Sequence, residues 1–180
     1  MTETTAPDRT SARTDAWLVA AATFFTVAVL IHGSDHVRRG TDAISRDVFW
    51  AGTASITLEI AVVVLACQRH RLAPLVATAA GFGLAAGYLL VHFLPARSWL
   101  SDSFTSAADV NPLSWFAASL EVSAAMTLGI VGLLALRERG GLASATAPKS
   151  DERTLRDGLL HPAALAMITG NAVILVLSFT

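Results

Sequence analysis

Charged residues are scarce in this 180-residue sequence. Asp, Glu, Lys and Arg make up 15% of it and hydrophobic residues 53%, whereas an ordinary soluble domain is about 25% charged. So few charges cannot cover a globular surface in water, which argues against a soluble enzyme. The formal net charge is −1, and without a basic excess we expect no nucleic-acid partner.

Cysteine and lysine are almost absent as well. The lone cysteine, Cys67, excludes an intrachain disulfide and any zinc site built from cysteines. Twelve of the thirteen basic residues are Arg, and alanine is abundant. This bias is typical of a GC-rich bacterial genome, so we expect a bacterial protein.

The sequence consists largely of long apolar segments. A helix needs about 20 consecutive apolar residues to cross a bilayer core. Five segments reach or approach that length: Ala16–His36, Val48–Cys67, Leu72–Leu94, Pro112–Leu136 and residues 159–180. They predict an all-α, polytopic integral membrane bundle of five transmembrane helices, with a four-helix core over residues 16–136 and a fifth helix over 159–180. A cleaved signal peptide is the alternative for the first segment, and a surface or re-entrant helix for the last.

The segments outside these runs are polar. Residues 1–15 are rich in Thr and charge and should form a disordered cytoplasmic tail, and residues 137–158 should form a cytoplasmic linker. Cytoplasmic loops carry an excess of Lys and Arg. Nine such residues fall on the side of the N-terminus and four on the other side. The sequence therefore predicts a multi-pass cell-membrane protein whose N-terminus is cytoplasmic and whose C-terminus is extracytoplasmic.

Ionisable residues inside a membrane are costly, so each one is a functional hypothesis. The apolar segments contain six of them near or below their outer ends: His32, Asp35, His36, Glu59, His92 and Glu121. Successive helices run in opposite directions, so residues at one depth must come late in outward-running helices and early in inward-running ones. The three histidines and Asp35 come late, and the two glutamates come early. The pattern predicts one polar site in the outer half of the bundle.

The residue types at this site indicate a transition metal. His32 and His36 are four residues apart and present two imidazoles on one helix face, and His92 adds a third. Together with the carboxylates of Glu59 and Glu121, these residues form a set that suits Zn or Fe in a mononuclear or dinuclear centre.

Two further residues and the two glutamates have additional expected roles at this site. Asp35 and Tyr88, which lies one turn before His92, are expected to orient the metal ligands. Glu59 and Glu121 are also the candidate catalytic residues, because a carboxylate can activate a metal-bound water. In an enzyme of this kind, the substrate would be lipid-like or a small amphiphile.

Three other functions fit the same residues, and one of them is a structural or assembly subunit whose polar groups only specify helix packing. A proton- or ion-coupled transporter or sensor would use Glu59 and Glu121, and such a short chain would then form a homo-oligomer. A b-type haem protein would use His32 or His36 together with His92 as axial ligands. The residues alone leave these alternatives open.

Overall fold

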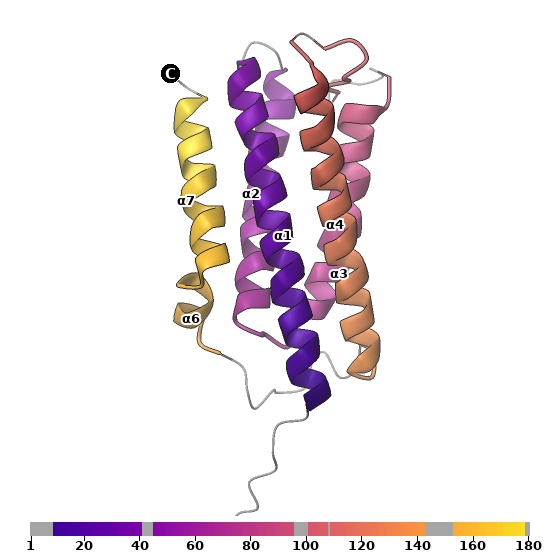
Figure 1. Cartoon of the computed structure of the whole chain (residues 1–180), viewed down its shortest axis with the longest axis vertical. Coiled ribbons are helices and arrows are strands. Elements are labelled where there is room, and N and C mark those ends of the chain that lie inside the picture. Colours follow the sequence, from indigo (N-terminus) through magenta and orange to yellow (C-terminus); the bar gives the residue numbers. More distant parts are fainter. Residues whose placement is uncertain (1–8, 41–44, 96–100, 108, 143–152, 179–180) are drawn as a thin grey trace, which may run out of the picture.

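The structure is a computed structural model that describes residues 9–40, 45–95, 101–107, 109–142 and 153–178. Every regular element in these ranges is a helix, which confirms the predicted all-α class. The bounds are α1 (Arg9–Arg39), α2 (Arg46–Cys67), α3 (Ala73–Tyr88) continued by the π-helical turn η2 (Leu89–Phe93), α4 (Pro112–Glu138), α6 (Leu155–Leu159) and α7 (Pro162–Leu177) (Figure 1).

Local chemistry sets the helix ends. Gly40 follows α1 with a φ of +81°, a left-handed conformation that costs glycine nothing and ends the helix. Ser45 caps α2 by accepting a hydrogen bond from the backbone of Val48. Asn111 caps α4 in a capping box, and Pro112 follows at the first helical position, where its missing N–H is not needed.

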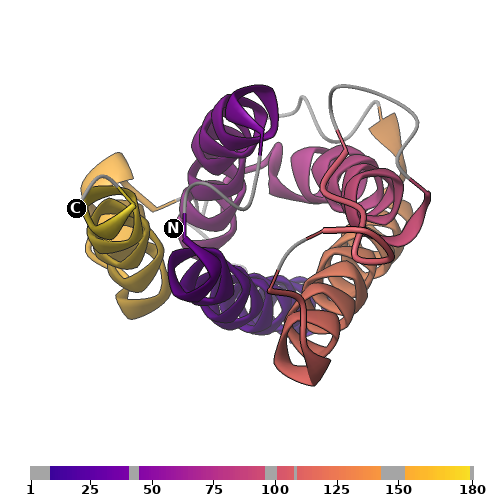
Figure 2. The ribbon, with the colours of Figure 1, turned by 90° about the horizontal axis from the view of Figure 1, so that it is seen from above.

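The helices form a ring with one helix outside it. Viewed along the bundle, α1, α2, α3 and α4 surround a common centre, and α7 lies outside against α1 and α2 (Figure 2). The C-terminal ends of α1, η2 and α7 and the N-terminal ends of α2 and α4 share one end of the bundle (Figure 1), here called the site end. The alternating directions expected from the sequence are therefore realised.

Four helices are long and apolar enough to cross a membrane, namely those spanning Ser11–Arg39, Arg46–Cys67, Ala73–Phe93 and Pro112–Glu138. Their outer faces carry large exposed apolar side chains, including Trp17, Phe116 and Ile130, which suit contact with lipid. Helix α7 has 16 residues, or about 24 Å at 1.5 Å per residue, which is less than the about 30 Å of a bilayer core. A complete fifth crossing and the orientation of the bundle remain predictions.

The structure differs from the sequence prediction at the N-terminus. Residues 1–8 lie outside the described ranges, but residues 9–15, which we expected in a disordered tail, form the first turns of α1. The reason is a pair of polar contacts across the bundle: Thr14 donates to Glu138, and Asp15 pairs with Arg139 at the end of α4. These contacts stabilise the extra turns.

Helices α3 and α4 are the most closely packed pair. A Cβ atom on Gly81 would lie 2.6 Å from the Cα of Gly129 and 2.7 Å from the carbonyl oxygen of Ala125. A Cβ atom on Gly132 would likewise lie 2.6 Å from the backbone nitrogen of Thr78. The two backbones approach to a distance that only glycine permits.

We expect Gly81→Ala to destabilise the bundle by about 1–3 kcal/mol, because the new methyl group meets backbone atoms that cannot move aside. The matched control is Gly83→Ala on the same helix, where a Cβ would meet nothing within 4 Å. This control should be neutral or stabilising, because alanine favours helix by about 1 kcal/mol over glycine. Thermal unfolding of both variants in detergent, followed by circular dichroism, measures the difference. Equal melting temperatures would contradict the close approach of α3 and α4.

Candidate metal centre

Three histidines from two helical segments meet at the site end. His32 and His36 project from α1, and His92 projects from η2, with one ligand nitrogen from each lying within 4.8 Å of the others. The rings of His32 and His36 stack with their centroids 4.7 Å apart, and the ring of His92 lies 4.7 Å from that of His32. His32 and His92 are buried, and His36 is partly buried. The cluster could hold a metal ion.

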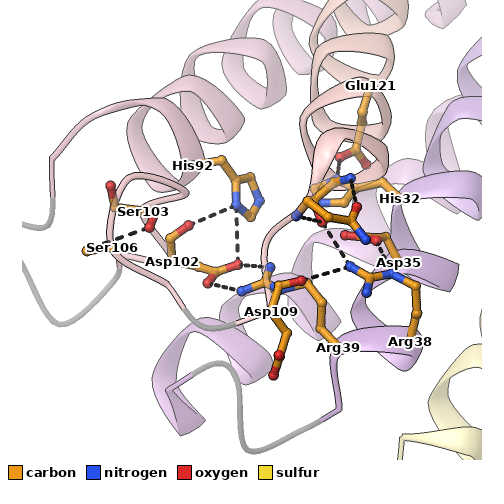
Figure 3. A network of polar contacts seen from close by, with 12 residues as sticks. His32, Asp35, Arg38, Arg39, His92, Asp102, Ser103, Ser106, Asp109 and Glu121 are labelled. Carbon is orange, nitrogen blue, oxygen red and sulfur yellow. Dashed lines mark hydrogen bonds and ion pairs between the residues drawn. The ribbon is translucent and has the colours of Figure 1, made fainter.

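Glu121 fixes one of these rings. Its carboxylate, on α4, bonds to Nδ1 of His32 (Figure 3). The other ring nitrogen of His32, Nε2, is buried and has no hydrogen-bond partner among the described residues, and the same holds for Nδ1 of His36. A buried polar atom without a partner lowers the stability of the folded state. A bound ligand that pairs with these two nitrogens would remove this cost.

The π-helical turn η2 sets the direction of His92. Such turns are rare and occur frequently at functional sites. The carbonyl groups of Val91 and His92 accept hydrogen bonds from the backbone nitrogens of Asp102, at 3.1 Å, and Phe104, at 3.0 Å. Residues 101–107, here called the strap, are thereby fixed across the end of η2, directly beside the histidine cluster.

The strap adds a buried ion pair to the site. Arg39 donates from Nη1 and Nη2 to the two carboxylate oxygens of Asp102 at 2.7 and 2.8 Å (Figure 3). Nδ1 of His92 lies 3.3 Å from the carbonyl oxygen of Asp102 and 3.4 Å from its Oδ2. Burial alone would raise the pKa of the Asp102 carboxyl, but the hydrogen bonds from Arg39 and His92 outweigh burial and hold this pKa well below its ordinary value.

The sequence analysis missed the roles of Arg39, Asp102 and Phe104. Phe104 is buried against the ring of His92, with centroids 4.7 Å apart, and the guanidinium of Arg39 lies over the Phe104 ring, 5.2 Å from its centroid. The charges in the sequence could have indicated the ion pair, because the Arg38-Arg39 pair and the acidic residues of the loop before α4 lie at the same end of the bundle.

Glu59 lies near the cluster with partners of its own. Its Oε1 accepts hydrogen bonds from Ser55 at 2.9 Å and from the hydroxyl of Tyr88 at 2.8 Å. Its Oε2 is buried without a partner among the described residues. Tyr88 thus contacts a carboxylate, and its ring lies edge-on to His32 with centroids 6.5 Å apart.

Asp35 pairs with an arginine of its own helix. This residue, which we expected to orient a metal ligand, bonds through Oδ1 to Nε of Arg38 at 2.8 Å, and its Oδ2 is buried without a partner among the described residues. Arg38 also donates to the carbonyl group of Asp109 and to Ser114, so it joins α1 to the start of α4. At the other end of the bundle, His161 caps α7 by accepting from the backbone nitrogen of Ala163 at 3.3 Å.

All five predicted metal ligands line one cavity of about 310 Å³. Apart from these groups and a few other polar side chains, its walls are apolar and come from α1, α2, α3, η2 and α7. The histidines occupy one part of the wall, and Glu59 and Tyr88 another. The arrangement is a predominantly apolar chamber with a polar, ligand-rich wall, enclosed by helices of membrane-spanning length.

Fold and site together define a helical bundle of membrane type with a buried histidine cluster. Comparison with known proteins adds no closer assignment: no protein-family model, curated protein or solved structure matches the chain. The functional argument therefore depends on the site itself.

Proposed function

We propose that this protein binds one transition-metal ion, Zn or Fe, through His32, His36 and His92. The observation that carries the proposal is the pair of buried imidazole nitrogens without partners, on His32 and His36, beside a third imidazole. Three neutral imidazoles in a tight group are a common ligand set for such ions.

The dimensions support this proposal. Metal–nitrogen bonds of about 2.0–2.1 Å in a tetrahedral site place the ligand nitrogens about 3.4 Å apart. The ligand nitrogens of the cluster are already within 4.8 Å of one another. Side-chain rotation alone can close the remaining difference of about an ångström. The fourth position would then face the cavity, as in catalytic sites that keep one position open.

The carboxylates support the site in two different ways. Glu121 holds Nδ1 of His32, and Asp102 lies beside Nδ1 of His92, which favours presentation of the opposite nitrogens to a metal. We therefore assign Glu121 to orienting His32, whereas the sequence analysis considered it a direct ligand. Glu59, held by Tyr88 at the cavity wall, is the group best placed to accept a proton from a molecule at the open position. When bound, the metal would supply a Lewis acid there.

The geometry favours a metal ion over haem. The three imidazole rings are in mutual contact, with centroids 4.7–5.7 Å apart, so all three can reach one ion, whereas axial ligation of a haem would use only two of them. A transporter or sensor based on Glu59 and Glu121 would need a route for protons, and the partners of both carboxylates are groups of this same site. Metal binding explains the close grouping of the three imidazoles as well as the contacts of the two carboxylates, whereas proton transport explains only the carboxylates.

The test is metal analysis of the purified protein, combined with cobalt substitution. We expect about one metal ion per chain by inductively coupled plasma mass spectrometry. After exchange with cobalt, we expect the visible absorption bands of tetrahedral Co²⁺. The matched control is His161→Asn, which removes a distant imidazole and keeps a good helix cap; its metal content should equal that of the wild type. Folded protein that carries no metal and takes up no Co²⁺ would overturn the proposal.

A further inference from the structure

The cavity beside the histidines has more space than a metal ion and a water molecule need. At about 310 Å³ it lies at the small end of the range of about 300–1,000 Å³ for pockets that bind organic ligands. The site as proposed so far explains the polar wall. It does not explain the apolar chamber in front of that wall.

Glycines keep this chamber open. Gly52 on α2 and Gly83 and Gly87 on α3 all line the cavity, and a Cβ atom on any of them would meet nothing within 4 Å. These glycines therefore differ from Gly81, which permits a close approach of two helices. Glycine in a helix costs about 1 kcal/mol relative to alanine, and no close helix contact accounts for it at these three positions.

Two of these glycines, one on α2 and one on α3, suit an entrance from the membrane. Gly52 and Gly83 are exposed and also line the cavity. Gly83 precedes Phe93, the end of its span, by ten residues, which is about 15 Å at 1.5 Å per residue. An opening between α2 and α3 at this position would lie at the depth of a bilayer core rather than at its surface.

The strap covers the His92 side of the site end. Arg39, Asp102 and Phe104 are all buried, and Phe104 packs on the ring of His92. Asp102 lies beside Nδ1 of His92 and binds Arg39 (Figure 3). A ligand that reached the histidines from water along this path would have to break the Arg39–Asp102 pair and displace the phenyl ring. A ligand in the membrane would meet neither obstacle at an opening between α2 and α3.

The polar wall indicates the head group of such a ligand. Oε2 of Glu59 is a buried acceptor without a partner, and Oε1 already accepts two hydrogen bonds. With Glu121 nearby, a second anion would be repelled, whereas a hydroxyl group can donate to Glu59 and offer its oxygen to the metal. The wall therefore fits a neutral donor.

We infer that the cavity binds a single-chain lipid alcohol, which enters from the membrane between α2 and α3 and places its hydroxyl group between Glu59 and the histidines. This inference rests on the proposed metal site for the position of the head group. It assigns to the site a ligand class with one apolar chain and a hydroxyl head. A two-chain phospholipid exceeds the space available.

The probe for this inference is a ten-carbon primary alcohol that carries a photoreactive diazirine in its chain. Metal-loaded protein in phosphatidylcholine vesicles is irradiated with the probe, and labelled peptides are identified by mass spectrometry. We expect labelling of cavity residues such as Ile56 and Ile174, suppressed by excess unlabelled decanol. The methyl ether of the probe cannot donate a hydrogen bond and should label these residues more weakly.

Variants test the route and the head-group contact. Gly87→Leu fills the cavity, and we expect cavity labelling to fall by about tenfold or more, the fold-change of an overpacked site. Gly52→Leu, from the opposite side of the entrance, should do the same. The matched control Ala86→Leu adds the same side chain at an exposed position that does not line the cavity, and its labelling should remain unchanged. Glu59→Leu should abolish the preference for the alcohol over the ether.

The outcomes separate this inference from the proposed function. If Gly87→Leu and Gly52→Leu retain both metal and labelling, or if decanol never suppresses labelling, the lipid-alcohol site is wrong while the metal site stands. If the wild type carries no metal, the proposed function fails first, whatever the labelling. Loss of labelling with full metal content in both glycine variants supports the inference.

Discussion

We expect the His36→Ala protein to lose its metal ion. His36 supplies one of three imidazoles, and its Nδ1 has no other partner among the described residues, so nothing in the protein replaces it. The loss in affinity should exceed the about 10–100-fold effect of removing a group that only orients a ligand. Competition titration against a chromogenic chelator measures the affinity, and His92→Ala should behave in the same way.

Glu121→Gln provides the graded comparison for this prediction. The amide is the same size and can still bond to Nδ1 of His32, so affinity should fall within about 10–100-fold rather than vanish. His161→Asn should bind metal as the wild type does. Equal affinity in His36→Ala and His161→Asn would remove His36 from the ligand set, and a larger loss in Glu121→Gln than in His36→Ala would make Glu121 the ligand.

Arg39→Ala should be the most destabilising single substitution at the site end. It leaves the carboxylate of Asp102 buried without its two strongest hydrogen bonds, and removal of one partner from a buried ion pair costs about 3–5 kcal/mol. The strap should then separate from η2 and become sensitive to protease. Unfolding in mixed detergent micelles, with limited proteolysis at neutral pH, measures both effects.

The double variant Arg39→Met/Asp102→Leu is the control for this prediction. It removes both charges and keeps apolar volume, so it should recover much of the stability that Arg39→Ala loses. Stability equal to the wild type in Arg39→Ala would show that the pair does not hold the strap. Stability of the double variant no better than that of Arg39→Ala would show that the unpaired carboxylate of Asp102 is not the source of the cost.

The helical bundle and the position of its polar site could be predicted because both follow from one-dimensional patterns. A bilayer demands long apolar runs, and these fix helix number and direction before any packing is known. Helix direction then fixes the depth of each polar residue. This is why His92, some 60 residues after His32, was expected beside it, and the structure has the two rings 4.7 Å apart.

The partners of those residues could not be predicted in the same way. Asp102 lies in an irregular loop, where no periodicity gives its direction, and its contact with Arg39 depends on two backbone hydrogen bonds to η2. The π-helical turn adds a residue to one turn of helix. No residue type between Leu89 and Phe93 distinguishes this turn from an ordinary α-helical turn in the sequence. Depth also cannot distinguish Glu121, which bonds His32, from Glu59, which bonds Tyr88.

The close seam between α3 and α4 has a mechanical consequence. Helices α1, α3 with its continuation η2, and α4 carry the three histidines and Glu121 and form the tightly packed part of the bundle, whereas the first half of α2 is largely exposed and faces the cavity. Just past the midpoint of α2, Glu59 accepts a hydrogen bond from Tyr88 at the end of α3. A displacement of the first half of α2 would therefore break few polar contacts and leave the imidazoles at their spacing, so that admission of a guest molecule and retention of an ion would be separate events.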